Sequence, residues 1–292
     1  MNIIIQSYST TGTRPNNEDA MELINNLNGS NKNNIKVLFN GVFDGHGGGE
    51  ISKMLIDPAK INISKYFCNT SSPIAQNLSA KKSFNKTIGP LFKRIQDKLK
   101  NYHVSSNTMG STAVIILLYP RGENSDRLSL KVINLGDSRA TICNEYNIGM
   151  SLSLDHKPHL YCEKNRIANM GGVLEYCEGD DPRIGGMSVS RSFGDLDNKY
   201  VSQEPDIYDY TINHDKFIIL ACDGVWDVLQ NQEVVDFILE KYDELKKGSK
   251  QLTELKGRSE NNIAQKLADY AIKKGSTDNI SISILFFADE LK

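Results

Sequence analysis

The sequence predicts an α+β fold whose core is largely antiparallel β-sheet. Short segments rich in Val, Ile and Phe recur along the 292 residues, each bounded by Gly, Asp or Asn, which is typical of strands. Segments with helical spacing of apolar residues lie between some of these strands but not between all of them. Because strand and helix do not alternate regularly, a layered α+β fold is favoured over a doubly wound parallel sheet.

The individual elements are expected as follows. Strands are predicted at residues 36–44, 112–119, 128–134, 217–223 and 280–287. Helices are predicted at residues 232–242, 262–273 and, with a more polar pattern, 83–100. Loops are predicted at the low-complexity stretch 25–34 and the acidic, glycine-rich stretch 175–186. No Pro-, Ser- or Gly-rich linker divides the chain, so residues 1–292 are expected to form a single domain.

Composition excludes several classes of partner and location. The 34 Lys and Arg residues nearly balance the 36 Asp and Glu residues, and a formal net charge of −2 argues against nucleic-acid binding. Five scattered cysteines without a C-x-x-C pair suggest neither a disulfide framework nor a zinc site, which fits a reducing compartment. No apolar stretch reaches the roughly 20 residues of a transmembrane helix, and Asn2 excludes N-myristoylation. We therefore expect a cytoplasmic protein, with the nucleus also open, that binds no membrane and is a monomer.

The strongest local signal is the segment VFDGHGGGE at residues 42–50. An apolar strand runs into Asp44, and the glycines that follow allow the backbone, including the Gly45 carbonyl, to approach a ligand closely. The segment is neither a P-loop nor a G-x-G-x-x-G motif, because Glu50 stands where the last glycine would be. The alternative is a tight turn from strand to helix with Asp44 as a cap.

The same pattern of a carboxylate at a strand end recurs. Asp223 follows the apolar run 217–222, Asp278 precedes the last predicted strand, and Glu18 lies close to Arg14 near the N-terminus. Each alone is more often a turn or cap residue, but together they can converge on one rim. Converging carboxylates repel one another unless a cation neutralises them, and oxygen ligands favour Mg²⁺ or Mn²⁺. With Arg14 and His46, the set predicts a two-metal phosphohydrolase centre.

Once these motifs are read together, the chain resembles the protein phosphatase 2C (PPM) family of metal-dependent serine/threonine protein phosphatases. Ten segments carry the resemblance, in order along the chain: GTRPNNEDAM (12–21), VFDGHGGGE (42–50), MGSTAV (109–114), NLGDSRA (134–140), LSLDHKP (152–158), NRIANMGGVL (165–174), MSVSRSFGD (187–195), EPDI (204–207), ILACDGVWDVL (219–229) and GSTDNIS (275–281). The resemblance implies a central sandwich of two antiparallel β-sheets flanked by α-helices on both sides, a four-layer αββα fold. It places two Mg²⁺ or Mn²⁺ ions at one edge of this sandwich.

The resemblance also implies the metal ligands. Asp44 would bridge both cations. Glu18 and the Gly45 carbonyl would bind one cation, while Asp223 and Asp278 would bind the other. Each of these positions matches a motif of the family, and no motif residue is missing.

Further roles follow from the same resemblance. Asp19 would orient a metal-bound water, and Asp137 would join Asp223 at a third, weaker metal site. Arg14 would bind the phosphate, and His46 would be the general acid. The acidic loop 175–186 stands where family members carry a variable flap beside the cleft.

These parts form a coherent expected mechanism. Two cations lower the pKa of a shared water from about 15.7 towards 7, so that hydroxide can attack phosphorus at neutral pH. Arg14 can hold two phosphate oxygens through its planar fork. Ser and Thr alkoxides are poor leaving groups, so His46 would donate a proton to the leaving oxygen. The expected substrates are phosphoproteins carrying phosphoserine or phosphothreonine.

The sequence offers two alternatives to this function. Cys177 and Arg183 have the C-x5-R spacing of cysteine-dependent phosphatases, but the acidic residues between them would raise the pKa of the thiol and repel a phosphate. A catalytically silent pseudophosphatase that binds phosphoproteins would be marked by loss of Asp44, Asp223 or Asp278, and all three are present.

The remaining conspicuous residues are expected to have structural roles. Arg191 and Asp195 are predicted to pair with each other, and Trp226 to lie in the core. The run 155–157 is predicted to be a turn before Pro158 and not a metal cluster.

Overall fold

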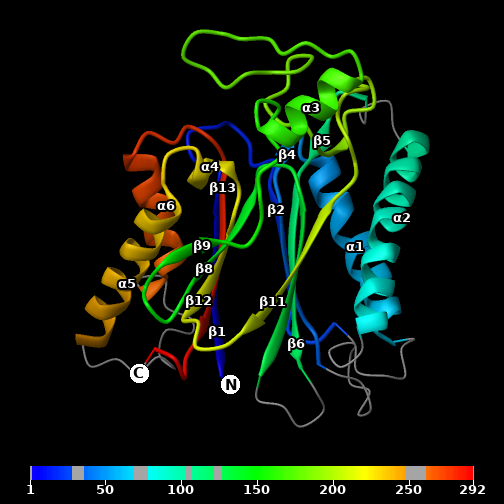
Figure 1. Cartoon of the computed structure of the whole chain (residues 1–292). Helices are drawn as coiled ribbons and strands as arrows, with labels where there is room; N and C mark the ends of the chain where they lie inside the picture. The colour runs from blue at the N-terminus through cyan, green and yellow to red at the C-terminus, as the bar shows by residue number, and fades with distance from the viewer. Residues whose placement is uncertain are drawn as a thin grey trace.

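Two five-stranded antiparallel sheets pack face to face, and helices cover both outer faces of the sandwich (Figure 1). This architecture is seen in a computed structural model of the chain, which describes residues 2–27, 36–68, 78–102, 107–121, 127–247 and 261–291. The four-layer αββα arrangement expected from the sequence is confirmed.

The first sheet brings the two ends of the chain together. Its strand order is β1 (Ile3–Thr10), β13 (Ile280–Phe287), β12 (Phe217–Ala221), β8 (Arg139–Cys143) and β9 (Gly149–Ser151). Strands β1 and β13 pair over their full length, from Ile3 opposite Phe287 to Thr10 opposite Ile280. The segments that follow β1 and precede β13 therefore emerge at the same end of the sandwich.

The second sheet and a small accessory sheet complete the framework. The second sheet has the order β11 (Asp206–Ile212), β7 (Leu128–Leu135), β6 (Ala113–Pro120), β3 (Leu38–Phe43) and β2 (Ala20–Ile24). The accessory sheet joins β10 (Phe193–Gly194), β5 (Gly110–Ser111) and β4 (Gly45–His46). It connects the residues after β3 to a distant part of the chain.

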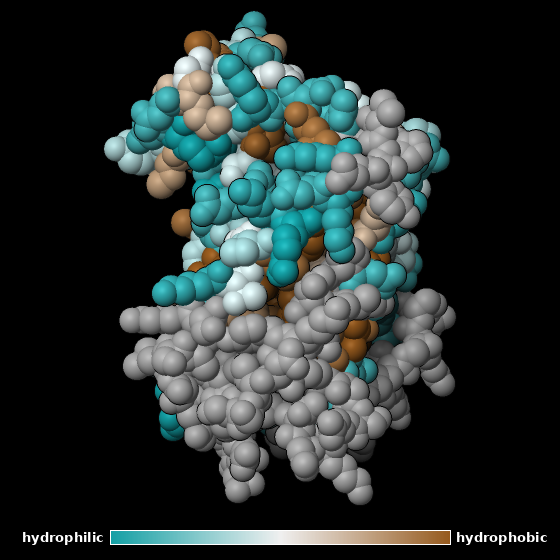
Figure 2. Space-filling view, turned by 90° about the vertical axis from the view of Figure 1, so that its right-hand side faces the viewer, coloured by the Kyte–Doolittle hydropathy of each residue, from teal (hydrophilic) through white to brown (hydrophobic). Residues whose placement is uncertain are grey.

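Helices form the two outer layers. Helices α1 (Glu50–Cys68) and α2 (Leu78–Tyr102) cover the second sheet, while α5 (Asn231–Lys247) and α6 (Ile263–Lys273) cover the first (Figure 1). The short helices α3 (Tyr161–Asn169) and α4 (Asp223–Trp226) lie near the end of the sandwich where β4 and β5 also lie. The described outer surface on the α2 side is mostly hydrophilic (Figure 2), in keeping with exposed Lys93, Arg94 and Asp97.

Three apolar cores hold the layers together, one between the sheets and one under each pair of helices. Strand β3 contributes to two of them: Phe39 and Phe43 face the helices, and Val42 faces the other sheet. All six residues of β3 are buried. Because close-packed interiors are stiff, the residue that leaves the end of β3 is held in a fixed position.

The structure confirms all eight elements predicted from the sequence; strand 280–287 has the predicted boundaries, and the boundaries of the other seven differ. The difference that bears on the candidate site concerns the segment 217–223, in which the strand ends at Ala221 and Asp223 begins helix α4. Loop 175–186 contains only isolated bridges, between Glu175 and Arg183 and between Ile184 and Met187. Residues 28–34 of the predicted loop 25–34 lie outside the described residues.

Several elements were not predicted. Strands β1, β2, β8, β9 and β11 and helices α1 and α3 are short, or mix polar with apolar residues, and α1 contains Pro58. Trp226 is buried, as expected, and its indole N–H donates to the Ala221 carbonyl at 2.9 Å.

Candidate metal and phosphate site

A cleft of about 750 Å³ opens at the end of the sandwich near β4 and α4. It is lined by eight of the nine residues predicted to form the site: Arg14, Glu18, Asp44, Gly45, His46, Asp137, Asp223 and Asp278. The ninth, Asp19, is buried behind the cleft wall. The structure thus brings together residues that are separated by up to 264 positions in the chain.

Asp44 directly follows β3, and hydrogen bonds of its backbone groups fix its position. Its N–H donates to the Thr112 hydroxyl at 3.2 Å, and its carbonyl accepts from the Thr112 N–H at 2.9 Å. Carboxylate oxygens of Asp44, Asp137 and Asp223 all lie within 4.8 Å of one another. Oxygens of Asp44 and Asp19 form a second group of the same size with the Cys222 sulfur, so Asp44 belongs to both groups.

The carboxylates of this cluster repel one another and are withdrawn from solvent. Burial raises the pKa of Asp44 well above its usual range, and the negative charges of Asp223, Asp19 and Asp137 raise it further. Burial also raises the pKa of Asp223 to about 7 and that of Asp19 to about 6. Both carboxylate oxygens of Asp19 and of Asp137 are buried without a hydrogen-bond partner. Such oxygens fit a hard divalent cation, which would supply the missing charge and partners.

Cys222 lies beside this cluster but has the properties of a buried thiol. Its sulfur donates to the Asn279 carbonyl at 3.3 Å and accepts from the Ser281 N–H at 3.2 Å. Burial, followed by the charges of Asp19 and Asp44, raises the pKa of this thiol well above its usual value. A protonated thiol is a poor ligand for Mg²⁺ or Mn²⁺, so the carboxylates remain the candidate ligands.

Gly45 permits a close approach of two chain segments. A side chain at this position would overlap the backbone carbonyl of Glu18. That same carbonyl accepts from the Ser52 hydroxyl, and the Glu18 carboxylate accepts from the Gly48 N–H at 3.0 Å. The glycine-rich segment after Asp44 therefore positions Glu18 at the cleft, although Glu18 and Asp278 lie outside the tight carboxylate groups.

Asn279 organises the rim, and the sequence did not single it out. Its side-chain Oδ1 accepts from the Glu18 N–H at 2.8 Å, and its side-chain Nδ2 donates to the carbonyls of Thr11 and Asn16 at 2.9 Å each. One buried side chain thus fixes the segment that carries Arg14. The available signal was a second polar residue directly after Asp278.

Arg14 pairs with a predicted metal ligand. Its Nη2 donates to Asp278 at 2.8 Å, and its Nε donates to the Thr277 carbonyl at 3.2 Å. A surface ion pair with Glu18, four residues further along the chain, is not the contact that forms. The Arg14 side chain is 55% exposed, so its guanidinium faces the open cleft.

His46 pairs with Asp195, which corrects one prediction. Nε2 of His46 lies 2.8 Å from the Asp195 carboxylate, which is buried and also accepts from the Ser192 hydroxyl. Arg191 instead contacts Glu163 at 2.6 Å. The predicted pair between Arg191 and Asp195 is therefore wrong, because pairing of β10 with β5, which also pairs with β4, brings Asp195 beside His46.

Lys157 is a further charged residue of the cleft. Its ammonium lies 2.8 Å from Asp227, 2.9 Å from Asp181 and 3.9 Å from Asp137. Burial lowers the pKa of this lysine, but the three carboxylates outweigh burial and raise it. Lys157 therefore remains a cation and links the acidic loop to the carboxylate cluster.

His156, the neighbour of Lys157, positions Asp137 from behind. Its Nδ1 accepts from the Gly136 N–H at 3.0 Å, so its Nε2 carries the proton and donates to Asp206 at 3.1 Å. Gly136 has φ = 102°, a conformation that favours glycine, directly before Asp137. All three side chains of the run 155–157 have protein partners, since Asp155 also pairs with Arg139 at 2.6 Å, so His156 and Lys157 do more than form the predicted turn.

The structure does not support the cysteine-phosphatase alternative. Arg183 donates to Asp180 at 2.9 Å and to the Gly186 carbonyl at 2.9 Å, which occupies its guanidinium within the acidic loop. Cys143, Cys162, Cys177 and Cys222 all carry free thiols.

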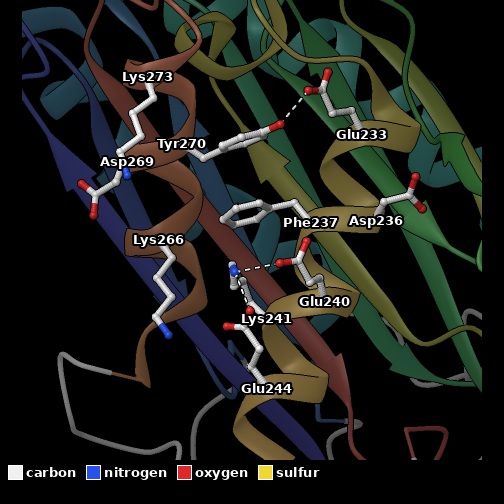
Figure 3. Close-up of a pocket in the computed structure, with 10 residues that line it drawn as sticks. All are labelled: Glu233, Asp236, Phe237, Glu240, Lys241, Glu244, Lys266, Asp269, Tyr270 and Lys273. Atoms are coloured by element: carbon white, nitrogen blue, oxygen red, sulfur yellow. Dashed lines mark hydrogen bonds and ion pairs between the residues drawn. The ribbon is translucent and has the colours of Figure 1, made fainter.

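Another hollow of about 740 Å³ lies between α5 and α6 (Figure 3). Some of its charged side chains pair with one another: Lys241 contacts Glu240 at 2.9 Å and Glu244 at 2.7 Å. The Tyr270 hydroxyl donates to Glu233 at 2.9 Å. Since the carboxylates of this hollow are not among the described residues whose ligand atoms converge, the chemistry is assigned to the cleft at the end of the sandwich. Among the described helices, none is both long and apolar enough to cross a membrane.

Comparison with known proteins shows what the chain is similar to. The family model for protein phosphatase 2C matches residues 5–280. The PP2C-like domain-containing protein R307 of Acanthamoeba polyphaga mimivirus is 43% identical over 180 residues, covering 57% of this chain and 98% of that protein. The probable protein phosphatase 2C 45 of Oryza sativa subsp. japonica is 34% identical over 283 residues, covering 96% of this chain and 86% of that protein.

The fold of the chain also matches that of a solved structure. The crystal structure of serine-threonine phosphatase 2C from Toxoplasma gondii superposes with a TM-score of 0.74 at 23% identity, covering 97% of this chain and 94% of that one. The family model spans most of the chain, and the rice relative is matched over most of its own length. The chain therefore belongs to the protein phosphatase 2C family of protein serine/threonine phosphatases.

Proposed function

We propose that the chain, as a single catalytic domain spanning residues 1–292, hydrolyses phosphoserine and phosphothreonine in proteins with Mg²⁺ or Mn²⁺ bound in the cleft. The observation that carries the proposal is the carboxylate group Asp44, Asp137 and Asp223, whose oxygens lie within 4.8 Å of one another. Arg14 and His46 line the same cleft.

The residues of the cleft fit two cations and a third, weaker one. Asp44 would hold both principal ions, with Glu18 and the Gly45 carbonyl on one, and Asp223 and Asp278 on the other. When bound, such a pair would neutralise the carboxylates and lower the pKa of a water to about 7.

Two buried carboxylates are proposed to have roles in addition to the binding of the two principal ions. Asp137 is buried with unpartnered oxygens next to Asp223 and would serve the third ion. Asp19 lies behind Asp44, also with unpartnered oxygens, and is proposed to orient the attacking water.

Arg14 is proposed to hold the phosphate. Its Nη2 and Nε have protein acceptors, whereas Nη1 has none among the described residues. A guanidinium presents several N–H donors in one plane, which matches the oxygens of a phosphate. Binding of the substrate would therefore align the phosphorus with the carboxylate cluster and offset the charge of the group.

His46 is proposed to protonate the leaving oxygen. Asp195 accepts from Nε2, and Nδ1 has no partner among the described residues. A ring protonated on both nitrogens would donate one proton to Asp195 and offer the other, on Nδ1, to the substrate. Asp195 thus fixes the orientation of the ring and is proposed as a positioning residue.

The test is phosphate release from a phosphothreonine peptide with Mn²⁺ or Mg²⁺, with EDTA, and with the Asp223→Ala variant. Turnover that requires metal and collapses in the variant is the expected result. A folded protein that binds metal and phosphopeptide but releases no phosphate would replace this proposal with the pseudophosphatase alternative.

A further inference from the structure

A separate hollow of about 480 Å³ lies on the other side of His46 from the carboxylate cluster. His46 and Met187 line both this hollow and the metal cleft. Asp195, the partner of His46, also lines the hollow but does not line the metal cleft. The imidazole therefore stands at the boundary between the two spaces.

The position of His46 at this boundary matters for the proposed reaction. In phosphate-ester hydrolysis the attacking water and the leaving oxygen lie on opposite sides of phosphorus. The water belongs to the carboxylate side, and a general acid must lie within hydrogen-bond distance of the leaving oxygen. The serine or threonine that carries this oxygen, with its neighbours in the substrate chain, must then extend past His46. The hollow is the space into which they extend.

The walls of the hollow are rigid. The Asn198 amide donates to the Ile184 carbonyl at 2.8 Å, which joins the loop after β10 to the acidic loop. The Asp197 N–H donates to the Asn107 carbonyl at 3.2 Å, which joins it to the segment before β5. The hollow is therefore formed before a substrate arrives, a condition that reduces the entropic cost of binding.

Apolar atoms make up most of its lining surface, although Asn107 and Asn198 also line it, and the charges at its rim offset one another. Met187, the ring of Tyr200 and the side chain of Thr108 line it. Exposed Asp197 and Lys199 carry opposite charges, and the Lys199 ammonium lies 5.0 Å from the Tyr200 ring centre. Since these charges offset one another, neither an acidic nor a basic substrate residue is favoured, and burial of apolar surface decides selectivity.

We propose that this hollow is a substrate subsite that binds an apolar side chain next to the phosphorylated residue of a phosphoprotein. The inference rests on the proposed function, because it takes His46 as the group that faces the leaving oxygen. A volume of about 480 Å³ lies within the usual size of ligand sites, about 300–1,000 Å³.

The experiment uses phosphothreonine peptides that differ only in the residue before, or only in the residue after, phosphothreonine. Leu, Ser, Asp and Lys are compared at each position, by kcat/KM with Mn²⁺ and by fluorescence anisotropy with the non-hydrolysing Asp223→Ala protein. We expect about tenfold better kcat/KM and affinity for Leu than for Ser on one side, the range expected for a small apolar group in a pocket. Asp and Lys should resemble Ser.

Variants of the lining residues test whether the preference for Leu arises in the hollow. Tyr200→Ala and, independently, Thr108→Glu should reduce the preference for Leu to less than about twofold, because they remove apolar lining or add a charge to it. Thr108 is exposed, so its replacement tests the hollow even if Tyr200→Ala folds poorly. Tyr146→Ala is the matched control, since this tyrosine is 73% exposed in the turn between β8 and β9, and it should keep the full preference.

Hydrolysis of an aryl phosphate separates the two proposals. A preference for Leu in the anisotropy measurement supports the subsite even if no substrate is turned over, an outcome that would overturn only the proposed function. Equal binding of all peptides, or a preference that persists in both hollow variants, overturns the subsite even if aryl phosphate is hydrolysed normally.

Discussion

The Lys157 ammonium lies 2.9 Å from the Asp181 carboxylate and thereby joins the acidic loop to the metal cleft. Replacement of Lys157 by Met should release this loop, because Asp181 loses its partner. We expect trypsin to cleave after Arg183 several times faster in Lys157→Met than in the native protein, since local opening exposes the backbone to proteases. The measurement is the rate of appearance of the two fragments in EDTA.

A matched control exists for this experiment. Lys241 also contacts two carboxylates, Glu240 and Glu244, but lies on α5. Lys241→Met should leave the cleavage rate at Arg183 unchanged. Faster cleavage in both variants would point to general destabilisation and contradict a local role of Lys157.

The carboxylate cluster predicts how the stability of the metal-free protein depends on pH. The pKa values of Asp223 and Asp19 are raised to about 7 and about 6 from 3.8, so ionisation of these groups opposes folding. Their contribution to stability is fully present below pH 3.8 and is lost as pH rises through 6 to 7. The melting temperature in EDTA should therefore be higher at pH 5.5 than at pH 7.5.

Binding of metal should oppose this fall of the melting temperature with rising pH. Bound Mn²⁺ favours the ionised carboxylates, so the increase in melting temperature on adding Mn²⁺ should be largest at pH 7.5 and shrink towards pH 5.5. At a metal concentration of about 100 times Kd the stabilisation is about 2.7 kcal/mol, which corresponds to several degrees. Asp44→Asn should lose most of this increase. An increase that is independent of pH would contradict the assignment of the cluster as the metal site.

The contact between His46 and Asp195 predicts a dependence on the leaving group. Asp195→Asn removes the carboxylate that holds the imidazole, so the rate on a phosphothreonine peptide should fall by about 10–100 times more than the rate on an aryl phosphate. The reason is that an aryl oxide leaves with little need of a proton. His46→Ala should show the same pattern with a larger loss.

Exposed Asp269 on α6 provides the control, since Asp269→Asn removes a carboxylate far from the cleft and should change neither rate. If Asp195→Asn slowed both substrates equally, Asp195 would not act through His46.

Arg14 is predicted to bind phosphate without being needed for metal. Arg14→Ala should raise the inhibition constant of inorganic phosphate by about tenfold, as expected for the loss of charge-assisted hydrogen bonds. It should not weaken Mn²⁺ binding measured by calorimetry, because it frees the Asp278 carboxylate. Weaker Mn²⁺ binding with an unchanged inhibition constant would instead assign Arg14 to the support of the metal site.

Much of this site could be predicted because its carboxylates follow strands or precede them. Asp44 and Asp223 come directly after apolar runs, and such runs are visible in the sequence. The family resemblance supplied the roles of Glu18, Asp19 and Asp137, which spacing alone does not distinguish from turn residues.

What could not be predicted depends on contacts between distant segments. Asp195 is 149 positions from His46, and only the accessory sheet places the two together. Asn279 was missed because its role lies in hydrogen bonds to backbone atoms of residues 11–18, which leave no pattern in the sequence. For the same reason the partners of Lys157 became apparent only when the acidic loop was seen beside the cleft.

The full-length pairing of β1 with β13, secured at the rim by Asn279, bears on biosynthesis. A ribosome makes Arg14 and Glu18 more than 250 residues before Asp278 and Asn279. Until the segment with Asp278 and Asn279 emerges, the segment carrying Arg14 lacks its anchor and the cleft lacks one wall. A nascent chain can fold its second sheet early, yet it would acquire the complete site only after Asp278 and Asn279 have emerged, so products truncated before Asp278 should be inert towards phosphoproteins.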